Sequence, residues 1–296
     1  MNELGFDDVK LFARVAALRS LSAVARERAV PVSQISRSLT RIEKQCGARL
    51  VHRSTHGLSL TTEGLLFLDY CRRLGDTLEE LEGEFALQQR NISGLVRVAA
   101  STVIAQYLVL PSLRALNERH PQLRVELEVS DRLADLVREG IDIAIRTSTQ
   151  LPETLVARRL GSLGRALYAS PDYVAQHGLP AHPDALPSHR LIVNSAATHL
   201  NQWPFIVDGQ LVHLTAEGRW RTNDTGMAAN MVLQGLGIGR LATIAADPLV
   251  RQQRLVPVLS AFVDPQPAPV YAVISSARQR LPKIKACIDH WAAWVG

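Results

Sequence analysis

The sequence predicts an α/β protein with an all-α part at its N-terminus, and three observations lead to this prediction. Residues 1–62 carry apolar residues at helical spacing on both sides of a proline turn. Residues 63–91 hold an apolar repeat without any proline. From residue 92 to 296, short apolar strands alternate with helical segments, which is typical of α/β folds with parallel sheets. We therefore expect three parts with these boundaries.

The composition excludes several classes of protein. The 296 residues are 47% apolar and 21% charged, as in a folded domain, and no apolar run is long enough to cross a membrane. Acidic residues stand where a signal peptide needs basic ones, so secretion is not expected. The three cysteines lie far apart, which argues against disulfides and a zinc site and fits the reducing cytoplasm.

The positive charge is concentrated at the N-terminus. The net charge is +5, and residues 1–62 hold ten Lys and Arg against five Asp and Glu. The next thirty residues reverse the sign. This asymmetry favours a nucleic-acid contact at one end of the chain, although a solvated surface would also produce it.

The first part reads as a helix-turn-helix. A helix is expected over 7–18, and Ser22 is expected to cap a second helix over 23–29. Pro31 lacks a backbone N–H and marks a turn. A third helix over 33–46 buries Ile35, Leu39, Ile42 and Cys46, which step by four, three and four. Such a helix, polar and basic on its outer side, fits the major groove of DNA.

The outer side of the third helix has the chemistry for this contact. Gln34 can pair with adenine and Arg37 with guanine, and the outer basic face continues at Arg41. Ser33 and Ser36, near the helix start, suit phosphate oxygens. The alternative is a three-helix packing module whose outer face is only solvated.

Residues 50–61 read as two short strands around a polar glycine turn, the wing of a winged helix-turn-helix. Arg53 and His56 would face phosphates. His52 and His56 do not make a metal pair, because the turn gives no helical spacing and supplies no third ligand. The histidines at 177, 182 and 189 also fit no standard metal site, so neither a metal nor a cofactor is expected.

A long helix is expected from Thr62, which can act as its cap, to about residue 90. Apolar residues at steps of four and three form a heptad seam flanked by charges. This narrow seam favours a partner helix over packing on the chain's own domain. The expected dimerisation residues are Phe67, Cys71, Leu74, Leu78, Leu81 and Phe85.

The remaining residues contain two α/β sets, which imply two lobes with a cleft between them. Strands are expected over 95–100, 125–129, 141–145, 166–169, 191–193, 219–222, 238–242, 255–259 and 270–274. Helices are expected from Ser101 to Arg119 with a restart at Pro111, and over 131–139, 171–177, 225–236 and 282–294.

Ligands of open α/β sheets bind at the carboxyl ends of strands and at helix starts. Polar residues at these places are expected to line the cleft and to bind a small polar or anionic effector, the alternative being that each is a helix cap or turn residue. They are Ser101, Thr102, Arg146, Thr147, Asn194 and Asn223, with Ser148, Ser195 and Asp224 beside them.

The chain resembles the LysR-type transcriptional regulators. The resemblance rests on the segments 20–22, 24–25, 32–37 and 60–64, with Phe12, Leu39, Ile42, Glu43, Gly47, Leu50 and Arg53, and in the second half on 135–146, 169–173 and 235–239. It implies the two-lobed fold of periplasmic binding proteins, in which the chain crosses twice between lobes: 92–161 with 268–296, and 162–267. It also implies that the linker helix forms the dimer.

The leading interpretation is a transcriptional regulator that binds duplex DNA in a sequence-specific manner and is controlled by an effector between the lobes. It would be a cytoplasmic, nucleoid-associated homodimer or homotetramer without a membrane partner. An enzyme with the same lobes is disfavoured, because no GxSxG, phosphate loop or HExxH occurs. A solute-binding protein is disfavoured by the basic N-terminus and the lack of a signal peptide.

Overall fold

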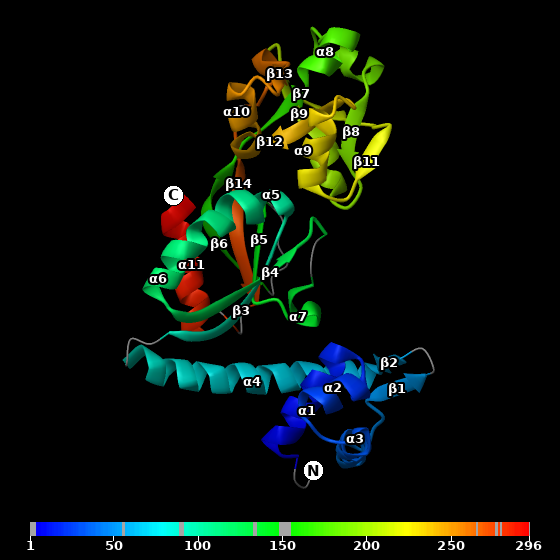
Figure 1. Ribbon diagram of the computed structural model, residues 1–296, viewed down its shortest axis with the longest axis vertical. Coiled ribbons are helices and arrows are strands. Elements are labelled where there is room, and N and C mark those ends of the chain that lie inside the picture. The colour runs from blue at the N-terminus through cyan, green and yellow to red at the C-terminus, as the bar shows by residue number, and fades with distance from the viewer. Residues whose placement is uncertain are drawn as a thin grey trace. The chain divides into compact units, whose positions relative to one another are not determined.

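The computed structural model describes residues 4–54, 57–88, 92–132, 135–147, 155–264, 266–275, 278 and 280–295. The chain divides into two compact units, Met1–Phe85 and Ala86–Gly296, and each is described by itself (Figure 1). No helix in these ranges combines the length and the apolar character that a membrane crossing needs.

The N-terminal unit begins with three helices, α1 (Phe6–Leu18), α2 (Leu21–Glu27) and α3 (Val32–Cys46). Their inward faces form one apolar core with Phe12, Val15, Val24, Leu39 and Ile42 at its centre, all fully buried. The cap of α2 differs from the sequence prediction. Ser20, rather than Ser22, accepts the N–H of Ala23 at 3.2 Å, because α2 begins at residue 21.

A two-stranded hairpin follows α3. Strands β1 (Val51–Ser54) and β2 (Gly57–Leu60) pair antiparallel, with Val51 opposite Leu60. The carboxylate of Glu43 in α3 accepts the N–H groups of Leu50 and Val51 at 2.9 and 3.2 Å. These bonds fix the base of the hairpin to α3.

The long helix α4 (Thr62–Gln88) starts inside the core of the N-terminal unit. Its cap is Thr61 and not Thr62, since the Thr61 hydroxyl accepts the N–H of Gly64 at 2.9 Å. A Cβ on Gly64 would lie 2.0 Å from the carbonyl oxygen of Leu50, so only glycine allows the helix to approach this closely. Phe67 packs edge-on against Phe12, with ring centroids 4.9 Å apart.

The second unit contains two five-stranded sheets. The first has the order β4-β3-β5-β14-β6, built from β3 (Ser93–Ala100), β4 (Gln122–Val129), β5 (Ile143–Thr147), β6 (Leu155–Leu163) and β14 (Ala268–Ser275). The second has the order β11-β8-β12-β7-β13, built from β7 (Arg165–Ala169), β8 (Leu191–Asn194), β11 (Trp220–Thr222), β12 (Ile238–Ala242) and β13 (Val256–Val258).

The sheets are mixed, whereas the sequence predicted parallel ones. Strand β3 pairs parallel with β4 and β5, but β14 runs antiparallel to β5 and β6. The chain leaves the first sheet after β6 and returns to it along β14, so these two strands run in opposite directions as neighbours. The second sheet repeats this arrangement, with β7 antiparallel to β12 and β13.

Helices cover the two sheets, and some of them contribute residues to the cleft described below. After β3 come α5 (Thr102–Ile104), a π-helical turn (Ala105–Val109), a 3₁₀ turn (Leu110–Ser112) and α6 (Leu113–Arg119). The expected helix over 131–139 is reduced to α7 (Leu136–Glu139). The second sheet carries α8 (Pro171–His177), α9 (Thr225–Leu233) and α10 (Thr243–Arg251). The remaining short elements are 3₁₀ turns at Pro183–Ser188, Thr198–Asn201 and Ser260–Phe262, and the hairpin β9 (Gln202–Val207) with β10 (Gln210–Thr215).

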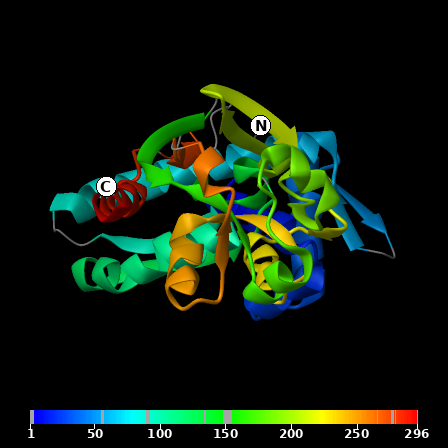
Figure 2. The ribbon, with the colours of Figure 1, turned by 90° about the horizontal axis from the view of Figure 1, so that it is seen from above.

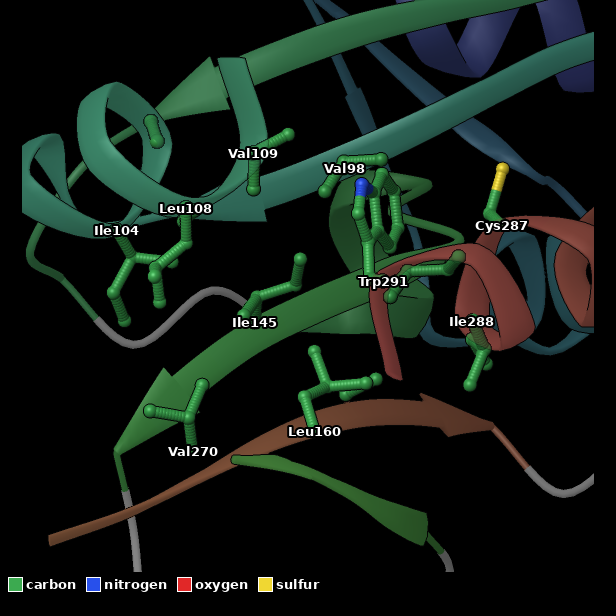
Figure 3. Packing of buried hydrophobic residues seen from close by; sticks show 14 of the residues in the cluster. Val98, Ile104, Leu108, Val109, Ile145, Leu160, Val270, Cys287, Ile288 and Trp291 are labelled. Atoms are coloured by element: carbon green, nitrogen blue, oxygen red, sulfur yellow. The ribbon is translucent and has the colours of Figure 1, made fainter. Parts of the chain in front are cut away.

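The last helix, α11 (Pro282–Val295), returns to the first sheet. Both views place it at the same end of that sheet as α6 (Figures 1 and 2). Trp291 is 1% exposed, and its indole N–H donates to the Ser112 hydroxyl at 3.0 Å. Figure 3 shows Trp291 and Ile288 in one core with Val98 and Ile145 of the sheet, so the final helix is part of the core of the first lobe.

Candidate functional sites

The outer face of α3 is the first candidate site. Ile35, Leu39 and Ile42 of this helix are buried, which turns the opposite side to solvent. Of the predicted DNA-contacting residues, Ser33, Gln34, Arg37 and Arg41 are exposed and Ser36 is partly buried. The Arg37 guanidinium donates to the Ser33 carbonyl at 3.3 Å, which lays it along the first turn.

Arg41 also has an internal partner. Its guanidinium donates to Asp8 of α1 at 2.5 Å; the Arg41 side chain is 53% exposed and that of Asp8 is 6% exposed. The backbone N–H of Gly5 donates to the same carboxylate at 3.3 Å. Arg41 therefore compensates a buried negative charge and fixes α3 to α1, while half of its side chain still faces outward.

One residue of this face escaped the sequence reasoning. Val32 begins α3 and is 44% exposed, next to Ser33 and Gln34. If α3 lies in the major groove of DNA, an exposed apolar side chain at its first residue suits the methyl group of thymine. The signal in the sequence was an apolar residue outside the buried stripe.

The hairpin beside α3 carries Arg53 in β1. The side chain of Arg53 and all of His56 lie outside the described residues, so their predicted phosphate contacts stay predictions.

The second candidate site lies between the two sheets of the second unit, where two cavities of about 40 and 50 Å³ adjoin each other. Ser101 and Arg165 line both. Asn194 lines the smaller cavity with Trp203 and Arg240, and Arg146 and Thr147 line the larger one with Asp131. We call this site the inter-lobe cleft.

Reciprocal hydrogen bonds cross the cleft. Thr225 of the second lobe donates to Asp131 of the first at 3.1 Å, and Thr102 of the first donates to Asp224 of the second. The side-chain amide of Asn194 also donates to Asp131, at 2.8 Å. Burial raises the pKa of Asp131, the bonds from Asn194 and Thr225 oppose that rise, and the nearby Asp224 adds to it.

Three arginines make the cleft positive. Burial lowers the pKa of Arg146, of Arg240 and, to about 10, of Arg165. The charge of Arg240 lowers the pKa of Arg165 further, and Asp131 opposes this effect. The Arg165 guanidinium reaches across the cleft to the Thr147 hydroxyl at 3.1 Å, a neutral partner. Cations that are costly to hold in their charged form favour an incoming anion.

The predicted effector residues have different surroundings. Ser101, Arg146, Thr147 and Asn194 line the cavities, whereas the Thr102 hydroxyl is bonded to Asp224. Asn223 is exposed and lines neither cavity. Sequence reasoning missed Asp131, Arg165, Trp203 and Arg240, which are brought in by tertiary packing and carry no local motif.

The predicted seam of α4 is divided between two environments. Phe67 and Cys71 pack into the core of the N-terminal unit, and burial raises the pKa of the Cys71 thiol to about 12. Leu74 and Leu81 are about half exposed, Leu78 is partly buried, and the side chain of Phe85 lies outside the described residues. Leu66 and Tyr70 are exposed as well and continue one face of the helix with Leu74 and Leu81.

The N-terminal unit has a helix-turn-helix with an exposed α3 and a β-hairpin wing, and the second unit has two lobes with a polar cleft between them. Together these features define a DNA-binding regulator with a ligand-binding domain. Two family matches agree. The family described as "Bacterial regulatory helix-turn-helix protein, lysR family" matches residues 6–65, and "LysR substrate binding domain" matches residues 89–295. The chain belongs to the LysR-type transcriptional regulators, and the members of this family are regulators and not enzymes.

Individual relatives extend over most of the chain. The regulator YhjC of Escherichia coli K12 is 32% identical over 86% of each chain. The regulator DmlR of the same organism is 28% identical over 98% of this chain and 94% of its own. Among solved structures, CrgA from Neisseria meningitidis is 25% identical with a TM-score of 0.65, covering 99% of this chain and 100% of its own. AphB from Vibrio cholerae is 26% identical with the same TM-score and the same coverage.

Proposed function

We propose that this regulator is controlled by a small anion bound in the inter-lobe cleft by Arg165, with Arg146 and Arg240 beside it. The observation that carries the proposal is the convergence of three partly buried arginines on the two adjoining cavities. Arg165 has a neutral hydroxyl as its hydrogen-bond partner, and Asp131, the acid that acts on it, is bonded to Asn194 and Thr225. A carboxylate or oxyanion would give the Arg165 guanidinium a charged hydrogen-bond acceptor in addition to this hydroxyl.

The size of the cavities limits the anion. A buried water needs roughly 10–15 Å³ of such space, so about 40 and 50 Å³ hold a few non-hydrogen atoms each. Small mono- and dicarboxylates and inorganic oxyanions fit this limit. The hydroxyls of Ser101 and Thr147 would complete their hydrogen bonding.

Regulation follows from closure of the cleft. The Thr102–Asp224 and Thr225–Asp131 bonds stabilise the closed arrangement, and an anion that bridges the lobes adds to them. The anion can shift the closed population only by as much as its affinity differs between the closed and open arrangements.

DNA binding uses α3 in the major groove. We assign the reading of base edges to Gln34 and Arg37, and contacts with phosphates to Ser33 and Ser36. Arg41 is partly exposed, and we assign it mainly to the contact with Asp8 that holds α3 against α1. Arg53 and His56 of the wing would contact flanking phosphates. The DNA partner implies a cytoplasmic protein on the nucleoid.

Self-association uses α4. We propose that the face of Leu66, Tyr70, Leu74 and Leu81 pairs with a second copy, and we leave Phe67 and Cys71 out of this interface because they pack internally. Two copies would present two α3 helices to two half-sites about one DNA turn apart. Pairing of two dimers into a tetramer is a further form of the same proposal.

The effector proposal is tested with charged and neutral isosteres. The full-length protein is titrated with acetate, oxalate and malonate and with acetamide, oxamide and malonamide at one ionic strength, and thermal unfolding is followed. At least one carboxylate should raise the unfolding temperature, while its amide should leave it unchanged, because only the former pairs with arginine. Equal effects of a carboxylate and its amide, or no effect of any carboxylate, would refute the proposal.

A further inference from the structure

A second, larger cavity lies outside the inter-lobe cleft, on the helical cover of the first sheet. Its volume is about 710 Å³, within the range of roughly 300–1,000 Å³ that small-molecule sites occupy. Arg119 and His120 line it from the end of α6, and Lys285 and His290 line it from α11. Its lining residues differ from those of the cleft.

The charge of this cavity is strongly positive. Arg119, Arg280 and Lys285 are exposed side chains that approach it from three places in the sequence. Asp289 is the acid among the lining residues, and it is ion-paired with Arg158 of β6. Three cations therefore face one cavity whose acidic residue is already paired.

Two histidines among the lining residues add hydrogen-bonding capacity to the cavity. His290 is buried, lies 3.0 Å from the Ser112 carbonyl through Nε2, and stacks on Trp294. This contact makes Nε2 the protonated nitrogen and fixes the ring. Burial, followed by the charges of Arg119 and His290, lowers the pKa of His120. The surroundings of His120 thus carry an excess of positive charge.

We propose that this cavity, which we call the α6–α11 basic pocket, is a second anion site that binds a small oligoanion with at least two phosphate or carboxylate groups. The cations are spread over α6, α11 and the segment before α11, so one singly charged group would reach only some of them. Arginine pairs with oxyanions through two parallel hydrogen bonds, and lysine acts as a point charge. Ile92, Pro282 and Ala286, which also line the cavity, are apolar, so the charged side chains supply the groups that would bind the anion.

The test is isothermal titration calorimetry of the full-length protein with inorganic pyrophosphate, with citrate and orthophosphate as further arms. Pyrophosphate or citrate should bind at one site per chain at least tenfold more tightly than orthophosphate. Tighter binding of pyrophosphate assigns the pocket to phosphate esters and tighter binding of citrate to polycarboxylates, and either result supports the proposal.

Variants separate this pocket from the other two cationic sites. The double variant Arg119→Gln with Lys285→Gln should weaken oligoanion binding at least tenfold. The matched control is Arg114→Gln. Arg114 is an exposed arginine of α6 that pairs with Glu118 and does not line the pocket, so this variant should bind the oligoanion as the wild-type chain does. Arg165→Met and Arg37→Gln should also bind normally, because they alter the cleft and the α3 face.

Three results would overturn the proposal: no binding of either oligoanion, unchanged binding by the double variant, or loss of binding in Arg165→Met or Arg37→Gln. Failure of the cleft proposal would leave this result untouched, since acetate and oxalate test the cleft and pyrophosphate and citrate test the pocket.

Proton uptake gives an independent readout. Burial is the main cause of the lowered pKa of His120, and the charges of Arg119 and His290 add to it; an anion beside Arg119 offsets these charges, so binding should raise the pKa of His120. Calorimetry near pH 6 in buffers of different ionisation enthalpy should reveal uptake of part of a proton. The His120→Gln variant should lose this proton uptake. Subtracting its uptake from that of the wild-type chain removes the protons that pyrophosphate itself takes up or releases. His290 and Asp289 also face His120 and are unchanged in both chains. Identical uptake by both chains would contradict the pocket assignment.

Discussion

The outer face of α3 and the inter-lobe cleft use the same side chain, arginine, in opposite surroundings. Arg37 and Arg41 are exposed, and Arg41 already compensates Asp8. Arg146, Arg165 and Arg240 are partly buried, and burial lowers their pKa values. Exposed cations attract a polyelectrolyte and are screened by salt, whereas buried cations select one small anion and are screened less.

This comparison gives two kinds of specificity. On α3, we expect phosphate attraction to be general and contacts with base edges to provide the selection. In the cleft, we expect the geometry of the two lobes to provide the selection, because the proposed anion would contact residues from both sheets. The predictions below probe these two regions and the elements that support them.

The largest effect is expected at α4, the helix that we propose pairs with a second copy of the chain. Leu74→Asp with Leu81→Asp places charges on the exposed face of α4 and should give monomers by sedimentation velocity. Affinity for a two-half-site operator should fall by about 10²–10⁴, since the second half-site no longer binds intramolecularly. The control Glu63→Asp leaves this face intact. Dimers of unchanged stability would contradict the proposed interface.

In the cleft, Arg165→Met should abolish most anion binding. Loss of one buried charged partner costs about 2–5 kcal/mol, or roughly 30-fold or more in the dissociation constant. Calorimetry with the tightest-binding carboxylate measures this change. Arg254→Met, an exposed arginine that lines neither cavity, is the matched control and should bind as the wild-type chain does.

The close approach of α4 to Leu50, within the unit that carries α3, is tested at Gly64. Gly64→Ala places a Cβ 2.0 Å from the Leu50 carbonyl oxygen, so the start of α4 must shift, at a cost of about 1–3 kcal/mol in unfolding free energy. Gly75→Ala in the same helix meets open space and should instead stabilise the chain by about 0.5–1 kcal/mol. Denaturant unfolding of both variants measures the contrast, and equal stabilities would contradict the close approach.

Base reading on α3 is tested at Gln34. Gln34→Ala should cost about 1–3 kcal/mol on the preferred operator and relax the preference at one base pair. Binding is measured on a set of single-base operator variants, with Lys44→Ala as an exposed control on the same helix. Uniform weakening on every duplex would instead indicate a phosphate contact for Gln34.

The smallest effect is expected at the wing. Arg53→Ala should weaken binding evenly across sequences and reduce the salt slope of log K by about one. Fluorescence anisotropy over a series of salt concentrations measures the slope. An unchanged slope would rule out a phosphate contact by Arg53.

The local sequence was sufficient to predict the bounds of an element where nearby residues cap its ends. Helix α8 covers Pro171–His177 as predicted, because Ser170 accepts the N–H of Tyr173 at 3.1 Å and Pro171 fits the first turn. Strand β12 also has its predicted bounds, Ile238–Ala242. The hairpin of β9 and β10 was missed, although Asp208 and Gly209 both have positive φ, as its tight turn requires.

Elsewhere tertiary contacts decided the outcome. The helix expected from Asp131 begins only at Leu136, and the Asp131 carboxylate is used by Asn194 and Thr225 of the other lobe. Helix α10 was not predicted, because Pro248 lies inside it and argues against a helix.

The sequence by itself determined the periodic elements: the buried stripe and exposed face of α3, the long helix after it, and the alternation of strands and helices. These follow from apolar spacing and capping within a few residues. Only the tertiary structure decided which side chains meet in the cleft, since Asp131 and Thr225 lie 94 positions apart. It also decided that Phe67 and Cys71 pack internally while Leu74 and Leu81 stay exposed, because one heptad pattern fits either a partner helix or the chain's own core.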